Sequence, residues 1–154
     1  MCRIVLAALA LGFVLPLTAQ AQEGALRGVW KVTEVSLTSP DTSWTYTDPR
    51  ARLLIFTEHH YSRMGARGSG SRERLSDEPS DAERLEAWQP FFADAGTYES
   101  TDSTVTFRVI VAKNPNNEGS LTQTATYRIE GDTLWITFET ATGAEISVTH
   151  VRLE

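Results

Sequence analysis

The chain has 154 residues, a formal net charge of −6, 41% hydrophobic residues and a single cysteine, Cys2. This length predicts one domain that is large enough to bury a hydrophobic core of its own. An acidic chain without a basic tract is not typical of proteins that bind nucleic acids or anionic lipid headgroups.

The first 21 residues have the layout of a secretory signal peptide. Arg3 gives a positive start, residues 4–17 are an apolar run too short to span a bilayer comfortably, and residues 19–21 (Ala-Gln-Ala) form a cleavage pattern. We expect cleavage directly after this pattern, which leaves a mature domain of residues 22–154 outside the cytoplasm, secreted or periplasmic. The alternative is an uncleaved N-terminal anchor.

The position of Cys2 and the remaining sequence indicate that the exported chain carries no lipid anchor, disulfide or membrane span. Cys2 precedes the apolar run, which excludes the lipid-bearing cysteine of a lipoprotein. The mature chain would contain no cysteine, so we expect no disulfide. No later apolar run has the length of a membrane span, so we expect no membrane insertion after cleavage.

Most of the mature sequence alternates between apolar and polar residues with the period of β-strands. The alternation slips between Val32 and Val35, which predicts a β-bulge near Thr33 and Glu34. The expected strands are residues 30–37, 42–47, 52–57, 60–67, 96–101, 104–111, 121–129, 133–140 and 145–153. Short turns between them predict an all-β fold, an antiparallel up-and-down meander barrel of about eight to ten strands.

One segment departs from the strand pattern. Residues 65–79 are rich in Gly, Ser, Arg and Glu and are typical of a mobile loop. Ser80 and Glu83 then form a capping-box pattern, which predicts a short helix that continues to Trp88 and ends at Pro90.

This predicted helix carries an apolar surface that must be buried. Leu85 and Trp88 are three residues apart and face the same way, and Phe91 and Phe92 continue that surface. We expect this segment to cover one mouth of the barrel and a ligand to enter there.

Five short motifs follow one another along the mature chain. They are residues 28–31 (Gly-Val-Trp-Lys), the hairpin of residues 54–57 and 61–64, residues 95–99 (Ala-Gly-Thr-Tyr-Glu), residues 131–134 (Gly-Asp-Thr-Leu), and Arg152 in the last strand. In order and spacing they resemble the lipocalin superfamily, whose first strand opens with a Gly-x-Trp motif. The closer resemblance is to the bacterial and fungal lipocalin-like domain group, a calycin-type β-barrel. The resemblance covers almost all of the mature chain and implies a small barrel with a buried cavity.

The resemblance also implies how one end of the barrel is closed. In lipocalins an arginine near the chain end packs on the motif tryptophan, which corresponds here to Arg152 on Trp30, beside Gly28. A guanidinium over an indole is a cation–π contact worth about 1–2 kcal/mol when it is desolvated.

The candidate ligand-binding residues are mostly aromatic side chains, with a few polar groups expected to face the same cavity. They are Trp44, Tyr46, Arg63, Trp88, Phe92, Tyr98, Phe107, Gln123, Tyr127 and His150. Rings of this kind also fill ordinary barrel cores, so they do not by themselves predict a cavity.

The histidines do not predict a metal site. His59 and His60 are adjacent and point to opposite faces of a strand, and the mature chain has no cysteine to complete a zinc site. We therefore expect no metal and no cofactor. His150 shares the inward phase of Arg152, and it is either a satisfied core histidine or a group that acts on a ligand.

Seven of the 14 basic residues lie between Arg50 and Arg84, and all seven are arginines. They form either an entrance that attracts a carboxylate or phosphate, or a solvated loop interleaved with acidic residues, which is the interpretation we favour.

No residue pattern predicts a particular reaction, and the catalytic residues, if any, are unknown. The sequence lacks an isolated carboxylate pair, a Gly-x-Ser-x-Gly elbow and a phosphate-binding loop. It therefore predicts an exported protein that binds a small, mostly apolar molecule in its barrel. One alternative is an isomerase-type or cyclase-type enzyme that uses Tyr127, His150 or Arg63. The other is a pocketless envelope protein that binds another protein through residues 65–79. The oligomeric state stays open.

Overall fold

The computed structural model of the chain describes residues 24–154, which include nine strands, helical residues 24–26 and an α-helix of eight residues. The elements are β1 (Gly28–Thr38), β2 (Ser43–Tyr46), β3 (Arg52–Phe56), β4 (His60–Ala66), α2 (Asp81–Trp88), β5 (Phe91–Ser100), β6 (Thr104–Ala112), the 3-10 turn η1 (Pro115–Asn117), β7 (Thr122–Glu130), β8 (Thr133–Glu139) and β9 (Glu145–Arg152). The predicted signal peptide, residues 1–21, lies outside the described residues. Within them, no helix is long and apolar enough to cross a membrane.

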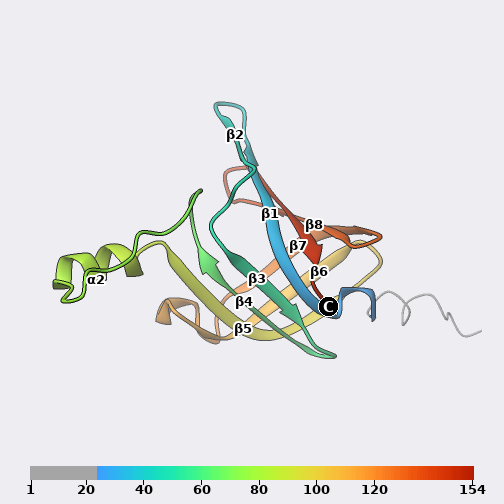
Figure 1. Ribbon diagram of the computed structural model, residues 1–154. Coiled ribbons are helices and arrows are strands. Elements are labelled where there is room, and N and C mark those ends of the chain that lie inside the picture. The colour runs from blue at the N-terminus through green and yellow to red at the C-terminus, as the bar shows by residue number, and fades with distance from the viewer. Residues whose placement is uncertain (1–23) are drawn as a thin grey trace, which may run out of the picture.

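The strands form one antiparallel sheet that closes on itself (Figure 1). Each strand from β3 to β9 pairs with the next along the chain, and β9 returns to pair with β1. On its other edge β1 pairs with β3 near its beginning and with β2 near its end. The barrel wall is therefore eight strands around, with β2 extending the position of β3, and the predicted up-and-down barrel is confirmed.

The predicted bulge in β1 is also confirmed. Val32 pairs with His150 and Glu34 with Thr149, which leaves Thr33 without a partner in the ladder. A second irregularity lies between β5 and β6, where a Cβ added to Gly96 would meet the Arg108 carbonyl oxygen at 1.9 Å. Bulges of this kind bend strands and increase their twist, which helps a sheet to close.

The main error in the predicted strands concerns β5. This strand begins at Phe91, five residues earlier than expected, and Phe91 and Phe92 pair with Ala66 and Gly65 of β4. The Phe91 ring still contacts Trp88 of the helix, with ring centres 5.8 Å apart, but both phenylalanines belong to the strand. Because the ladder reaches this far, it places Asp94 of β5 directly opposite Arg63 of β4.

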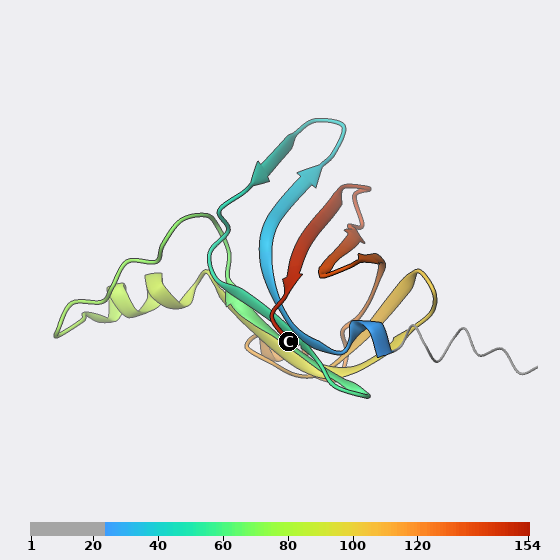
Figure 2. The ribbon, with the colours of Figure 1, turned by 45° about the vertical axis from the view of Figure 1, so that its right-hand side comes forward.

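Helix α2 has the predicted capping box but not the predicted position. The Glu83 backbone N–H donates to Ser80 Oγ at 3.3 Å, and the Ser80 N–H donates to Glu83 Oε2 at 2.8 Å. The helix projects away from the barrel (Figures 1 and 2) and buries none of its residues. Trp88 is 55% exposed, so the prediction that this segment covers the barrel mouth is wrong. Its indole instead lies 4.5 Å from Lys113 Nζ, a contact that needs no burial.

The hydrophobic core is concentrated toward one end of the barrel. We call this the closed end: β1 begins there, β9 ends there, and the hairpins β3–β4, β5–β6 and β7–β8 turn there. The opposite, open end carries the loops of residues 67–90, 113–121 and 140–144. The core side chains are Leu26, Trp30, Leu54, Phe56, Tyr61, Tyr98, Val105, Phe107, Ala125, Tyr127, Leu134 and Ile136.

Candidate functional site

The structure brings together the three residues that the resemblance assigns to barrel closure. Trp30 is fully buried, and its indole Nε1 donates to the Leu26 carbonyl oxygen at 2.7 Å. Arg152 Cζ lies 4.0 Å from the centre of that ring, and the guanidinium donates to two backbone carbonyls at 2.6 Å. Gly28 has a φ of +130°, and a Cβ there would meet the Glu154 carbonyl oxygen at 2.1 Å. The closed end is thus sealed by a cation–π stack between a partly exposed guanidinium and a fully buried indole.

Tyr98 and Tyr127 belong to the closed end and do not line the barrel pocket described next. Their hydroxyls donate to the carbonyl oxygens of Thr57 at 2.9 Å and Thr101 at 2.8 Å. Each tyrosine thereby holds the backbone of a hairpin turn by a hydrogen bond: Tyr98 at the β3–β4 turn and Tyr127 at the β5–β6 turn. The structure does not place these two predicted ligand contacts where a ligand in the barrel would reach them.

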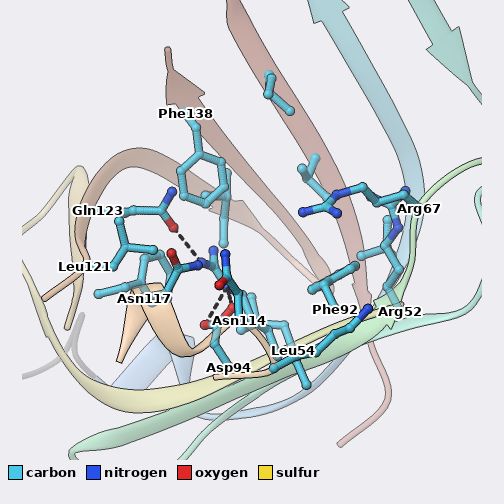
Figure 3. A pocket seen from close by; sticks show the side chains of 18 of the residues that line it. Arg52, Leu54, Arg67, Phe92, Asp94, Asn114, Asn117, Leu121, Gln123 and Phe138 are labelled. Atoms are coloured by element: carbon cyan, nitrogen blue, oxygen red, sulfur yellow. Dashed lines mark hydrogen bonds and ion pairs between the residues drawn. The ribbon is translucent and has the colours of Figure 1, made fainter. Parts of the chain in front are cut away.

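A pocket of about 870 Å³ reaches from the open end into the barrel (Figure 3). This volume lies within the range of small-molecule sites, roughly 300–1,000 Å³. The apolar side chains lining it include Leu54, Phe92, Phe107, Ile136, Phe138 and Ile146. Of the ten predicted ligand-binding residues, five line this pocket: Arg63, Phe92, Phe107, Gln123 and His150.

Trp44, Tyr46 and Trp88 are the other predicted contacts that lie away from the pocket. Trp44 and Tyr46 stand on β2, with ring centres 4.6 Å apart, and Trp44 is exposed. Within the described part of the chain β2 pairs with β1 alone, beyond the closed wall of the barrel. Neither Trp44 nor Tyr46 lines the pocket.

The polar centre of the pocket is an ion pair between β4 and β5. Arg63 Nε donates to both Asp94 carboxylate oxygens, at 2.8 and 2.9 Å, and the side chains are only 19% and 13% exposed. The Tyr61 hydroxyl donates to the same carboxylate at 2.8 Å. On the other side Arg63 Nη2 donates to Gln123 Oε1 at 2.5 Å, which links β4 to β7 across the interior.

Aromatic rings surround this network and hold it in a low-dielectric environment. Arg63 Cζ lies 5.3 Å from the centre of the Phe107 ring and 5.8 Å from that of Phe138. Burial raises the pKa of Tyr61, and the hydrogen bond to Asp94 raises it further. Tyr61 therefore stays a protonated phenol that donates to Asp94, and it does not act as a base near neutral pH.

Tyr61 and Asp94 belong to this polar network and were not predicted from the sequence as site residues. Tyr61 shares the phase of Arg63 on β4 and was identifiable from that alternation. Asp94 was missed because the predicted strand began at Gly96. Extending the alternation back to Phe92, a residue of the same phase, is the signal that would have found it.

The Arg63–Asp94 ion pair gives a first prediction, which concerns stability. Replacing Asp94 by Asn keeps the shape but leaves the mostly buried Arg63 guanidinium without its counter-charge. Breaking a fully buried pair costs about 3–5 kcal/mol, and this pair retains some exposure, so we expect a loss of about 2 kcal/mol in urea unfolding.

The matched control for this prediction is Glu99→Gln, which breaks the exposed pair of Glu99 with Arg108. We expect that change to cost less than about 0.5 kcal/mol. Equal losses in Asp94→Asn and Glu99→Gln would contradict a special role for the interior pair.

His150 lines the pocket, but its ring is hydrogen-bonded to the backbone of β8. Its ring is buried, and Nδ1 donates to the Leu134 carbonyl oxygen at 3.2 Å. Burial lowers the pKa of His150 to about 4, so the imidazole is neutral near neutral pH. His59 and His60 are exposed in the β3–β4 hairpin. Among residues 24–154 no three His, Cys, Asp or Glu side chains are grouped to hold a metal ion.

Comparison with known proteins adds little to this description. No family model and no curated protein matches the chain. A solved structure described as a redesigned β-barrel is similar to it, with 13% sequence identity over 86% of this chain and 96% of that chain, and a TM-score of 0.45. That similarity is too distant to support any argument about function.

Proposed function

We propose that this protein is an exported, lipocalin-like binding protein that holds one small, mostly apolar molecule inside its barrel. The observation that carries the proposal is the pocket of about 870 Å³, which is sealed at the end formed by Trp30 and Arg152 and open at the other. A deep pocket with apolar walls and a few convergent polar groups is the usual form of a small-molecule site. Export rests on the signal-peptide pattern of residues 1–21.

The lipocalin-like part of the proposal has its own support. Gly28, Trp30 and Arg152 were selected from short motifs, and they meet at one end of an antiparallel barrel. The packing at this end requires a glycine at Gly28, an indole at Trp30 and a planar cation at Arg152. This arrangement supports the resemblance beyond a shared barrel shape.

Binding is better supported than a reaction. Of the three residues considered for an isomerase-type or cyclase-type enzyme, Tyr127 lies outside the barrel pocket and His150 is a neutral ring on a backbone carbonyl. Arg63 is engaged by Asp94 and Gln123. A proton-transfer catalyst needs a donor or acceptor within reach of the substrate. The side chains of Arg63 and His150 are already hydrogen-bonded to groups of the fold. The pocketless alternative is disfavoured by the volume of the pocket.

The proposal predicts that filling the pocket abolishes binding. Val148 lines the pocket from β9, so Val148→Trp places an indole in the space that a ligand would occupy. We expect this variant to bind the neutral fluorescent probe N-phenylnaphthylamine at least about tenfold more weakly than the wild type, which is a loss of about 1.4 kcal/mol. Fluorescence titration measures the two dissociation constants.

The control variant is Val111→Trp, which adds the same ring to the exposed surface of β6. It is expected to bind the probe like the wild type. Native mass spectrometry of protein purified without detergent adds an independent readout, because a retained ligand appears as a mass shift. Probe binding that survives Val148→Trp, or that is lost equally in Val111→Trp, would place the probe elsewhere and refute the proposal.

A further inference from the structure

The charge of the pocket differs in sign from the charge of the whole protein. Four cationic side chains line it, Arg52, Arg63, Arg67 and Lys113, whereas the lining carboxylates are Asp94 and Glu139. The pocket therefore has a formal excess of two positive charges in a chain of net charge −6. Low-dielectric walls concentrate such a field, which attracts anions from solvent.

Three of the six charged groups that line the pocket, Arg63, Asp94 and Lys113, already have partners in the fold. Arg63 and Asp94 neutralise one another in the interior. The Lys113 ammonium donates to the carbonyl oxygens of Trp88 and Phe91 and lies over the Trp88 ring. The remaining cations are Arg52 at the beginning of β3 and Arg67 directly after β4.

Arg52 and Arg67 share one aromatic ring. The Cζ atom of each guanidinium lies 5.8 Å from the centre of the Phe92 ring. Figure 3 shows the three side chains together on one side of the pocket, opposite Gln123 and Leu121. The two cations thus converge on one place at the open end, beside the apolar interior.

In the described part of the chain, residues 24–154, this pair of arginines has no carboxylate partner. No ion pair there includes Arg52 or Arg67, and Arg52 Nε donates to the Ala66 carbonyl oxygen at 3.0 Å. Burial lowers the pKa of Arg52, the positive charge of Arg67 lowers it further, and Tyr46 acts in the opposite direction. Two neighbouring like charges of this kind are relieved by an anion placed between them.

We propose that Arg52 and Arg67 form an anion subsite, so that the ligand is an apolar molecule carrying a carboxylate or phosphate at one end. The proposal rests on the proposed function, because the apolar body of the ligand occupies the barrel pocket. The guanidinium fork suits oxygen anions, which it binds through paired N–H donors. Phe92 positions both cations and contacts the first apolar atoms of the ligand.

The test compares two fluorescent probes with the same rings, anilinonaphthalene sulfonate and the uncharged N-phenylnaphthylamine. We expect the wild type to bind the anionic probe more tightly. Arg67→Met is expected to weaken the anionic probe about tenfold, the effect of losing one charge-assisted contact, and to change the neutral probe less than about twofold. Added salt is expected to weaken the anionic probe alone.

The control is Arg74→Met, which removes the same charge from the exposed loop of residues 67–90 without touching the pocket lining. It is expected to leave both affinities unchanged, which separates local contact from a change in net charge. The variant Arg67→Met is preferred to Arg52→Met because Arg52 also holds the Ala66 carbonyl. Unfolding curves of both variants show whether the fold is retained.

Competition then identifies the chemical group of the ligand. Dodecanoate, dodecyl phosphate and dodecanol are titrated against the bound anionic probe, and the preferred headgroup is the one that displaces it at the lowest concentration. Dodecanol competing as well as both anions would overturn the anion subsite, as would Arg67→Met weakening both probes equally. Failure of both probes to bind would instead refute the proposed function itself.

Discussion

Replacing Trp30 by alanine is expected to lower the free energy of unfolding by about 3–5 kcal/mol, the usual cost of deleting a fully buried indole. The ring is fully buried, bonded to the Leu26 carbonyl and covered by Arg152. Its loss leaves a cavity at the closed end and a guanidinium without its aromatic partner. Urea unfolding measures the change, with an unchanged slope showing that the unfolded state is the same.

Trp88→Ala is the matched control, since it makes the same chemical change on α2. Trp88 is 55% exposed and sits on a helix with no buried residue, so we expect a loss below about 1 kcal/mol. Should Trp30→Ala be too unstable to purify, Trp30→Phe keeps most of the ring and still loses the bond to Leu26. Similar losses at Trp30 and Trp88 would show that the closed end does not stabilise the barrel as described.

The second large effect is a dependence of stability on pH that originates in His150. Its pKa is lowered from 6.5 to about 4 by burial, so the folded protein keeps this ring neutral while the unfolded chain binds a proton below pH 6.5. The contribution of His150 is therefore fully present above pH 6.5 and is lost as the pH falls toward 4. A difference of this size corresponds to about 3 kcal/mol.

This dependence is isolated by comparing variants, because carboxylates titrate in the same range. We expect the free energy of unfolding of His150→Gln to fall about 3 kcal/mol less than that of the wild type between pH 6.5 and 4. His60→Gln, which changes an exposed histidine, is expected to follow the wild type. A wild type and a His150→Gln variant with parallel pH profiles would contradict the buried, neutral state of this ring.

The sequence predicted the barrel well because its signals are local. Alternation along Val105, Phe107 and Val109 defines a strand whose inward side chains are indeed buried. The phase slip between Val32 and Val35 located the bulge, since one extra residue inverts the alternation. The cap of α2 was predictable for the same reason, as both of its partners lie within three residues of each other.

What the sequence failed to predict depends on contacts between distant segments. Leu85 and Trp88 indicate an apolar helix face, but nothing local says whether that face meets the barrel. Trp44 and Tyr46 have the phase of core residues on a strand that extends past the barrel wall. The Ala-Asp-Ala run around Asp94 has weak strand propensity, and only pairing with β4 keeps it extended. The interior ion pair was hidden for that reason.

Residues 67–90 lie between two paired strands, and this position determines which changes the barrel tolerates. They form a loop of 24 residues between two strands that pair up to Ala66 and Phe91, and the Arg67 N–H continues this pairing to the Pro90 carbonyl at 2.8 Å. Residues 68–70 also bond to residues 48–50, whereas residues 71–89 lie outside the strand pairing and form an insertion at a hairpin tip. We therefore expect changes of length or sequence within residues 71–89 to alter the surroundings of the opening and to leave the register of the strands unchanged.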